Sequence, residues 1–239
     1  MNQKIKFDVI ICGKEALIED RINVGEVKNF LSMFKAQDLG TCLSVLRYRR
    51  VDLAMICQES FSNNEAMQLF KEIKKALPLI PVIFLVSEPH FKNIEVYYKL
   101  GADLVIREPV NPEILFKSVL RLVDPQRSGK FRIHDRYEVK LKMSWREEDS
   151  EHFKKGKTLN LASGGMFVSE CDFLPNRRSL VNFNIEFFKD DIKVISGKAI
   201  VRWTRTIAAG PELAGFGAEF LYVNVPEFHQ ALSQFPPAK

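Results

Sequence analysis

The sequence predicts an α/β domain with a doubly wound parallel sheet, followed by an all-β domain that forms a small β-barrel. In the first half of the chain, short apolar runs alternate with amphipathic helical stretches, as in repeated strand and helix units. In the second half, many short strands are joined by turn residues. The polar segment 125–130 contains Pro125 and Gly129, as domain linkers often do. We therefore expect domains at residues 1–124 and 131–239, joined by this linker.

The strands of the first half are expected to be buried. Four runs are apolar on both faces, which is typical of a parallel sheet covered by helices. They are residues 9–12, 53–57, 82–86 and 104–106. The helical spacing of apolar residues predicts helices at 64–77, 93–100 and 112–123. Asn111 is placed to cap the last of these helices. We expect the second strand of the sheet at residues 31–36, within an otherwise ambiguous region.

The second half alternates apolar and polar residues with the period of half-buried strands. The predicted strands are residues 137–145, 181–187, 198–203 and 215–220, and the segment 158–169 holds a glycine pair followed by the apolar run 166–168. The charged segment 147–157 is expected to be a hairpin loop. Residues 225–235 predict a short amphipathic helix that packs on the barrel. We expect Trp203 to belong to the barrel core, with a role as a stacking platform as the less favoured alternative.

Composition limits the classes of function. The chain has 239 residues and a net charge of +5 from 35 basic and 30 acidic residues, which is compatible with an anionic ligand but weak support for nucleic-acid binding. The four cysteines are scattered without a CxxC motif, so we expect neither disulfides nor a metal site, and a reducing cytoplasm. The sequence shows no signal peptide and no apolar run long enough for a membrane span.

A set of polar residues and glycines lies at the start of the second half. Arg132 and Arg136 are followed by Asn160 and by a glycine pair that ends in Gly165. Guanidinium groups bind phosphate through paired hydrogen bonds and also bind the O6 and N7 edge of guanine. Asparagine donates and accepts at a base edge, and glycine lets the backbone approach a ligand. Two arginines at this spacing alone would be an ordinary surface pair, whereas the combination favours a compact anionic ligand with guanine bases.

This pattern resembles that of PilZ domains, bacterial β-barrels of which many bind cyclic di-GMP. The family pattern is RxxxR followed by [DN]xSxxG, and Ala162 stands where the family has serine. The resemblance covers about residues 129–235. It implies that Arg132, Arg136, Asn160 and Gly165 bind cyclic di-GMP, either as one molecule or as a stacked pair. It names no cofactor or metal.

The first half resembles the receiver domain of two-component response regulators. The resemblance rests on residues 51–53, on residues 80–85 and on Gly101-Ala102-Asp103 with Pro109. A working receiver holds Mg²⁺ with an acidic pair after the first strand and accepts a phosphoryl group on an aspartate after the third. A lysine after the fifth strand pairs with that phosphoryl group.

The residues that carry this chemistry are replaced in the present chain. The acidic pair aligns with Cys12 and Gly13, the acceptor with Cys57 and the lysine with Glu108. No carboxylate cluster remains for a hard dication, and a glutamate repels a phosphoryl group. We therefore predict a degenerate receiver that is not phosphorylated at this site. Cys12 and Cys57 are expected to fill the vacated pocket as small buried residues, with a redox pair as the alternative.

Taken together, the two resemblances imply a cyclic di-GMP effector that is not an enzyme. Ligand would close the arginine arm over the barrel and reorient the first domain, which would signal to an unidentified protein partner in motility or biofilm formation. The alternative is a ligand-independent scaffold for motility or pilus machinery. A homodimer through residues 93–122 is compatible with the pattern. A DNA-binding regulator is disfavoured because the sequence contains no helix-turn-helix pattern.

Overall fold

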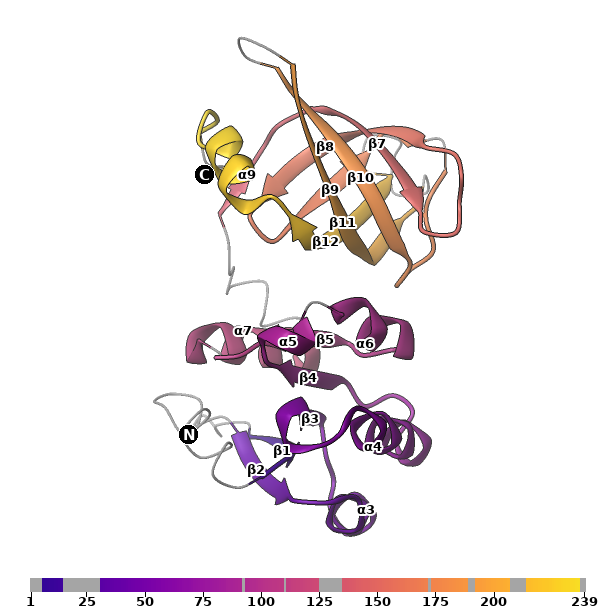
Figure 1. Cartoon of the computed structure of the whole chain (residues 1–239), viewed down its shortest axis with the longest axis vertical. Coiled ribbons are helices and arrows are strands. Elements are labelled where there is room, and N and C mark those ends of the chain that lie inside the picture. Colours follow the sequence, from indigo (N-terminus) through magenta and orange to yellow (C-terminus); the bar gives the residue numbers. More distant parts are fainter. Residues whose placement is uncertain are drawn as a thin grey trace, which may run out of the picture. The chain divides into compact units, whose positions relative to one another are not determined.

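The computed structural model describes residues 6–14, 31–91, 93–109, 111–124, 135–171, 173–188, 192–206 and 214–236 (Figure 1). The chain divides into two compact units, Met1–Ile133 and His134–Lys239. Each unit is described by itself below. The predicted linker 125–130 lies outside the described residues.

The first unit contains a five-stranded parallel sheet in the order β2-β1-β3-β4-β5. Its strands are β1 (Phe7–Cys12), β2 (Leu31–Ala36), β3 (Leu53–Cys57), β4 (Val82–Val86) and β5 (Leu104–Arg107). The four predicted buried runs and the second strand at 31–36 are confirmed. Every residue of β3 and β4 is buried, which explains why these strands are continuously apolar.

Helices cover both faces of this sheet. They are α3 (Leu39–Tyr48), α4 (Asn63–Ala76), α5 (Glu88–Phe91), α6 (Ile94–Leu100) and α7 (Pro112–Val123), with a 3-10 turn at Gln58–Ser60. The Phe84 ring contacts Phe70 of α4 and Tyr97 of α6 on one face. Leu115 and Val119 of α7 pack on the opposite face.

The helix boundaries follow from local capping. Ser62 and Glu65 form a reciprocal capping box at the start of α4. The Asn111 side chain accepts hydrogen bonds from the backbone N–H groups of Glu113 and Ile114, so the predicted cap of α7 is confirmed. Gly101 ends α6 with a φ of 102°, a left-handed conformation that glycine adopts without steric cost.

The second unit is a closed antiparallel barrel. The strands are β6 (Arg136–Tyr137), β7 (Lys142–Glu147), β8 (Lys154–Ala162), β9 (Gly165–Ser169), β10 (Leu180–Phe188), β11 (Ile192–Arg205) and β12 (Gly215–Val223). Their order is β6-β8-β7-β10-β11-β12-β9, and an additional β8–β9 pairing closes the ring. The short strand β6 pairs with the carboxyl end of β8, at Leu161 and Ala162.

Two predictions about the barrel strands are wrong in detail. The predicted strand 137–145 is two strands, β6 and β7, because the buried Thr158 hydroxyl donates to the Val139 carbonyl at 2.6 Å and accepts from the Leu141 N–H at 3.0 Å. The Thr158 hydroxyl therefore takes the place of strand–strand hydrogen bonds at Val139 and Leu141, between β6 and β7. The predicted loop 147–157 is shorter, since its lysine-rich end belongs to β8.

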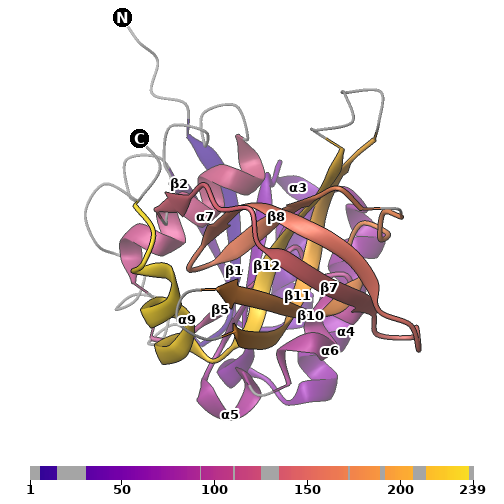
Figure 2. The same cartoon turned by 90° about the horizontal axis from the view of Figure 1, so that it is seen from above.

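Aromatic residues fill the barrel and extend to its C-terminal helix. Trp145, Phe183 and Phe216 are fully buried. Helix α9 (Val225–Leu232) follows β12 (Figure 2), and its buried Phe228 makes edge-on contacts with Phe187 and Phe220. The predicted amphipathic helix is thus confirmed. No helix among the described residues is long and apolar enough to cross a membrane.

Candidate ligand-binding site

Three neighbouring strands bring several of the predicted site residues together. Arg136 of β6 is opposite Ala162 of β8, and Ala162 is opposite Gly165 of β9. Leu161 is fully buried in the barrel core. Because successive side chains of a strand point to opposite faces, Ala162 belongs to the outer face of the barrel. Arg136, Ala162 and Gly165 therefore form one row across this outer face.

Asn160 belongs to a second row on the same face. It is opposite Phe167 of β9, Phe167 is opposite Gly217 of β12, and Gly217 is opposite Trp203 of β11. Asn160 and Ala162 are two residues apart, so their side chains share a face. Within the described residues, neither Asn160 nor Arg136 has an intramolecular hydrogen-bond or ion-pair partner for its side chain. Their polar groups are available to a ligand.

An aromatic pair completes the second row. The rings of Phe167 and Trp203 are stacked, with centroids 5.0 Å apart and an interplanar angle of 25°. Trp203 lies over Gly217, where a Cβ atom would come within 2.2 Å of the indole. The Arg205 guanidinium lies 5.5 Å from the Trp203 ring centroid. An exposed ring with a guanidinium over it is a surface of the kind that stacks on nucleobases.

The expectation that Trp203 belongs to the core is wrong, because its side chain is 41% exposed. The cause is a register shift in β11 between Val201 and Trp203. Val201 faces inward and is fully buried. In a regular strand Trp203 would face the same way, but one extra residue turns it to the outer face. A glycine within a strand pattern, Gly217, is the sequence signal that something packs closely against the backbone there.

Gly165 also has a structural reason to be glycine. A Cβ atom there would lie 2.4 Å from the Ala218 carbonyl oxygen of β12. The Gly164 carbonyl accepts a hydrogen bond from the Phe220 N–H at 3.0 Å. Close approach of β9 and β12 therefore requires glycine at this position whether or not a ligand binds.

The other predicted arginine, Arg132, lies outside the described residues. Its participation in the site stays a prediction. Arg136 is exposed at the start of the barrel and can be placed. A third positive group on this face, Arg202, is paired with Glu219 at 3.0 Å.

The residues that the resemblance assigns to a degenerate receiver site lie at the carboxyl ends of β1, β3 and β5. Cys12 and Cys57 are the last residues of β1 and β3. Gly13 follows β1, and a Cβ atom there would lie 2.9 Å from both the Cys57 Cβ and the Ser60 Oγ. Glu108 follows β5 and is 6% exposed. Among the described residues, no group of three or more histidine, cysteine or acidic side chains could hold a metal ion.

Cys12 lies against a different cysteine from the one proposed as its redox partner. Its Sγ donates a weak hydrogen bond to the Cys42 Sγ at 3.5 Å. This bond and burial raise the pKa of Cys12 well above its ordinary value, and the same bond lowers the pKa of Cys42. Cys12 is opposite Ile56 in the sheet, so Cys57 points to the other face. The geometry therefore favours small buried residues over a pair of Cys12 with Cys57.

Comparisons with known proteins found similarity only to solved structures. No family model matches the chain, and no curated protein matches it. Among solved structures, the Bacillus subtilis inhibitor of motility (MotI/DgrA) is 14% identical, with a TM-score of 0.37 over 43% of this chain and 48% of that chain. This chain thus covers about half of MotI/DgrA.

Receiver domains are among the solved structures found. The CheY-like receiver domain protein of Methanospirillum hungatei JF-1 is 20% identical over 52% of this chain and 98% of its own, with a TM-score of 0.45. The receiver domain of Brucella abortus NtrX is 21% identical over 49% of this chain and 98% of its own, with a TM-score of 0.44. The architecture itself is a five-stranded parallel sheet followed by a closed six-stranded antiparallel barrel.

Proposed function

We propose that this chain is a non-enzymatic effector that binds cyclic di-GMP on the outer face of its barrel. The observation that carries the proposal is the placement of Arg136, Asn160 and Gly165 on adjacent rows of one face. Arg132 would join them from the arm that precedes β6. The ligand is a dianion with two guanine faces, and these residue types bind phosphate and guanine edges.

Trp203 extends this proposal with a surface for one guanine. It is exposed, backed by Phe167 and in the same row as Asn160. Asn160 lies on the same face, separated from Trp203 by β9 and β12, so the two side chains would contact different parts of the ligand. Base–aromatic stacking contributes about 1–3 kcal/mol per base, which is comparable to a good polar contact.

Ala162 weakens the proposed site without removing it. The loss of one neutral hydroxyl contact costs about 0.5–1.5 kcal/mol, or up to roughly tenfold in affinity. A charge-assisted arginine contact is worth about twice a neutral hydrogen bond. With Arg132 and Arg136 both in the sequence, we expect micromolar binding.

The first unit would transmit the signal to a protein partner. Cys57 replaces the phosphoryl acceptor and Glu108 replaces the lysine, so phosphorylation would not control this unit. Closure of the arm over the ligand would instead change how the receiver-like unit is presented. Its partner, and dimerisation through residues 93–122, are parts of this proposal that need their own tests.

A ligand-independent scaffold is the second candidate, and two observations favour it. Ala162 lacks the hydroxyl of the family pattern, and Gly165 is explained by its approach to Ala218 alone. In that case the barrel and the receiver-like unit would serve as interaction modules in motility or pilus machinery.

Isothermal titration calorimetry with cyclic di-GMP separates the two candidates. The full chain is expected to bind in the micromolar range, and Arg136→Ala is expected to weaken binding by at least tenfold, because a bond to a charged group contributes about 1.5–3 kcal/mol. Lys140→Ala is the matched control, since Lys140 is a nearby exposed cation outside the proposed rows. Absence of heat at tens of micromolar would favour the scaffold.

A further inference from the structure

Two helices of the first unit end at the same edge of the sheet. Helix α3 leads into β3 and α4 leads into β4, and β3 and β4 are parallel neighbours. The helices contact each other. Their carboxyl ends therefore lie side by side at the edge where these strands begin. This is the edge opposite the degenerate receiver site, which lies where the strands end.

This edge carries a concentration of positive charge. We define the basic end as residues 47–50, at the end of α3, together with residues 71–79 at the end of α4. It contains six basic side chains and one acidic side chain, Glu72. The basic residues are Arg47, Arg49, Arg50, Lys71, Lys74 and Lys75. Helix carboxyl ends carry partial negative charge, so cations are stabilised there. Each end carries only about half an elementary charge, so six cations leave this edge with excess positive charge.

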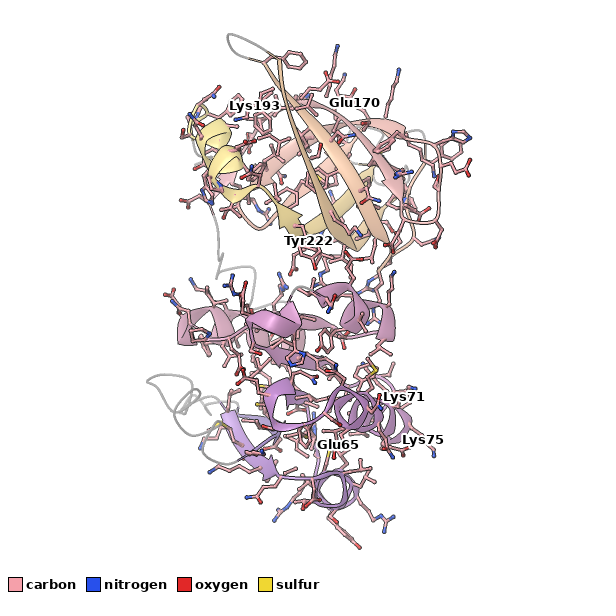
Figure 3. The ribbon with its side chains drawn as sticks, in the orientation of Figure 1. Glu65, Lys71, Lys75, Glu170, Lys193 and Tyr222 are labelled. Atoms are coloured by element: carbon pink, nitrogen blue, oxygen red, sulfur yellow. The ribbon has the colours of Figure 1, made fainter. Side chains whose placement is uncertain are left out.

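Some of these cations are neutralised and others are available. Arg50 pairs with Asp52 at 3.2 Å, and Lys74 pairs with Asp103 at 3.0 Å. Lys75 reaches Glu72 only at 3.9 Å. Within the described parts of the chain, no carboxylate pairs with Arg47 or Lys71. Figure 3 shows Lys71 and Lys75 extending outward from α4.

Two large apolar side chains are exposed on the same segments. Leu79 is 96% exposed and Tyr48 is 77% exposed. Leu79 follows Lys75 by one helical turn along the chain, and Tyr48 lies between Arg47 and Arg49. Elsewhere in this unit apolar side chains of this size are mostly buried. Exposed apolar side chains on the same segments as the cations would suit a partner that is negatively charged and also takes up apolar groups.

We propose that the basic end binds the surface of an anionic lipid bilayer, with Tyr48 and Leu79 entering the headgroup region. Cations near an anionic leaflet gain from its negative potential, while apolar and amphipathic side chains partition into the interface. A nucleic acid would satisfy the cations but would offer nothing to Leu79. An acidic protein would need a complementary shape, whereas a bilayer tolerates scattered cations with apolar groups between them.

Co-sedimentation of the full chain with vesicles tests this proposal. Vesicles with about one-third phosphatidylglycerol in phosphatidylcholine are expected to bind the protein, and pure phosphatidylcholine vesicles are expected not to. Each cation near the surface contributes roughly fivefold to binding, so Arg47→Ser with Lys71→Ser should weaken it about 25-fold. Leu79→Ser should weaken binding roughly fivefold at constant charge.

The matched control is Lys140→Ser with Lys155→Ser, which removes two exposed cations of the barrel unit. It removes the same net charge and should leave binding unchanged. Equal loss in both double variants would show attraction by net charge alone and would overturn the proposal. Equal binding to neutral vesicles, or an unchanged Leu79→Ser variant, would also overturn it. So would tighter binding to duplex DNA than to anionic vesicles, with the same dependence on Arg47 and Lys71.

Discussion

The edge of the parallel sheet and the outer face of the barrel differ in what they retain of the patterns they resemble. At the sheet edge, Cys12, Gly13, Cys57 and Glu108 stand where the receiver pattern has the groups that hold a metal ion and a phosphoryl group. On the barrel, Arg136 and Asn160 remain and only one neutral hydroxyl is missing at Ala162. Charge that is lost or reversed removes a binding site, whereas a lost hydroxyl reduces its affinity.

Packing makes the first loss hard to reverse. Gly13 approaches Cys57 and Ser60 so closely that a Cβ atom would need a neighbour to move. The Ser60 hydroxyl accepts a hydrogen bond from the Lys14 N–H at 2.8 Å. The space beside Gly13 is therefore already filled by the small side chains of Cys57 and Ser60. On the barrel, Ala162 lies on a half-buried outer surface where one more atom meets solvent or ligand.

The largest expected effect comes from an attempt to restore the phosphoryl acceptor. Cys57→Asp would place a carboxylate at a position that is 1% exposed, and the described residues contain no cluster of metal ligands there to stabilise it. We expect a loss of about 3–5 kcal/mol in the free energy of unfolding at neutral pH, measured by urea denaturation. Burial raises the carboxyl pKa in the folded state, so the unfolded state binds fewer protons and stability falls as the pH rises above about 4.

Cys57→Ser is the control for this experiment, since it keeps the size of the side chain and adds no charge. It should cost much less than the aspartate variant, and its stability should not share the same pH dependence. A Cys57→Asp protein as stable as the parent, which also took up phosphate from acetyl phosphate, would mean that this edge still works as a receiver site.

The next test concerns the aromatic row, by which we mean the stacked Phe167 and Trp203 on the outer face of the barrel. Trp203→Leu should weaken cyclic di-GMP binding by about tenfold, since base stacking contributes about 1–3 kcal/mol. The calorimetric measurement should be paired with urea denaturation. Trp203 is half-exposed, so the change should cost less stability than Trp145→Ala, which removes a fully buried ring.

The same variant allows a spectroscopic check. Trp145 and Trp203 are the two tryptophans of the chain. If a guanine stacks on Trp203, cyclic di-GMP should quench the fluorescence of the parent protein and leave that of Trp203→Leu unchanged. Quenching of equal size in both proteins would place the ligand away from the aromatic row.

The sequence predicted the strands well because their burial is simple to recognise. The run 53–57 is apolar throughout since helices cover both faces of β3. The second strand at 31–36 was needed by the fold and is present. Strand alternation was less reliable in the barrel, where Thr158 interrupts the ladder through its hydroxyl. A single side chain can create a break that no periodicity reveals.

The sequence identified those candidate site residues whose type and spacing match a motif. It missed those that depend on how the strands are arranged. Arg136 and Asn160 follow from the sequence pattern, but the contribution of Trp203 depends on a bulge in β11. In a regular strand Trp203 would face inward like Val201, but the extra residue between them turns its side chain to the outer face. Likewise, Cys42 became the neighbour of Cys12 because α3 crosses that face of the sheet, which spacing alone does not show.

The smallest expected effect restores the missing hydroxyl and addresses the comparison most directly. Ala162→Ser should strengthen cyclic di-GMP binding by up to about tenfold, because one neutral hydrogen bond contributes about 0.5–1.5 kcal/mol. Ala162 is opposite both Arg136 and Gly165, so the hydroxyl of the introduced serine would lie between β6 and β9, the strands that carry those residues. Ser163→Ala is the control at the adjoining position, where a hydroxyl is already present. If Ala162→Ser leaves affinity unchanged while Arg136→Ala abolishes it, the arginine contact is sufficient without this hydroxyl. If neither change matters, the outer face of the barrel is not a nucleotide site and the ligand-independent scaffold is the better account.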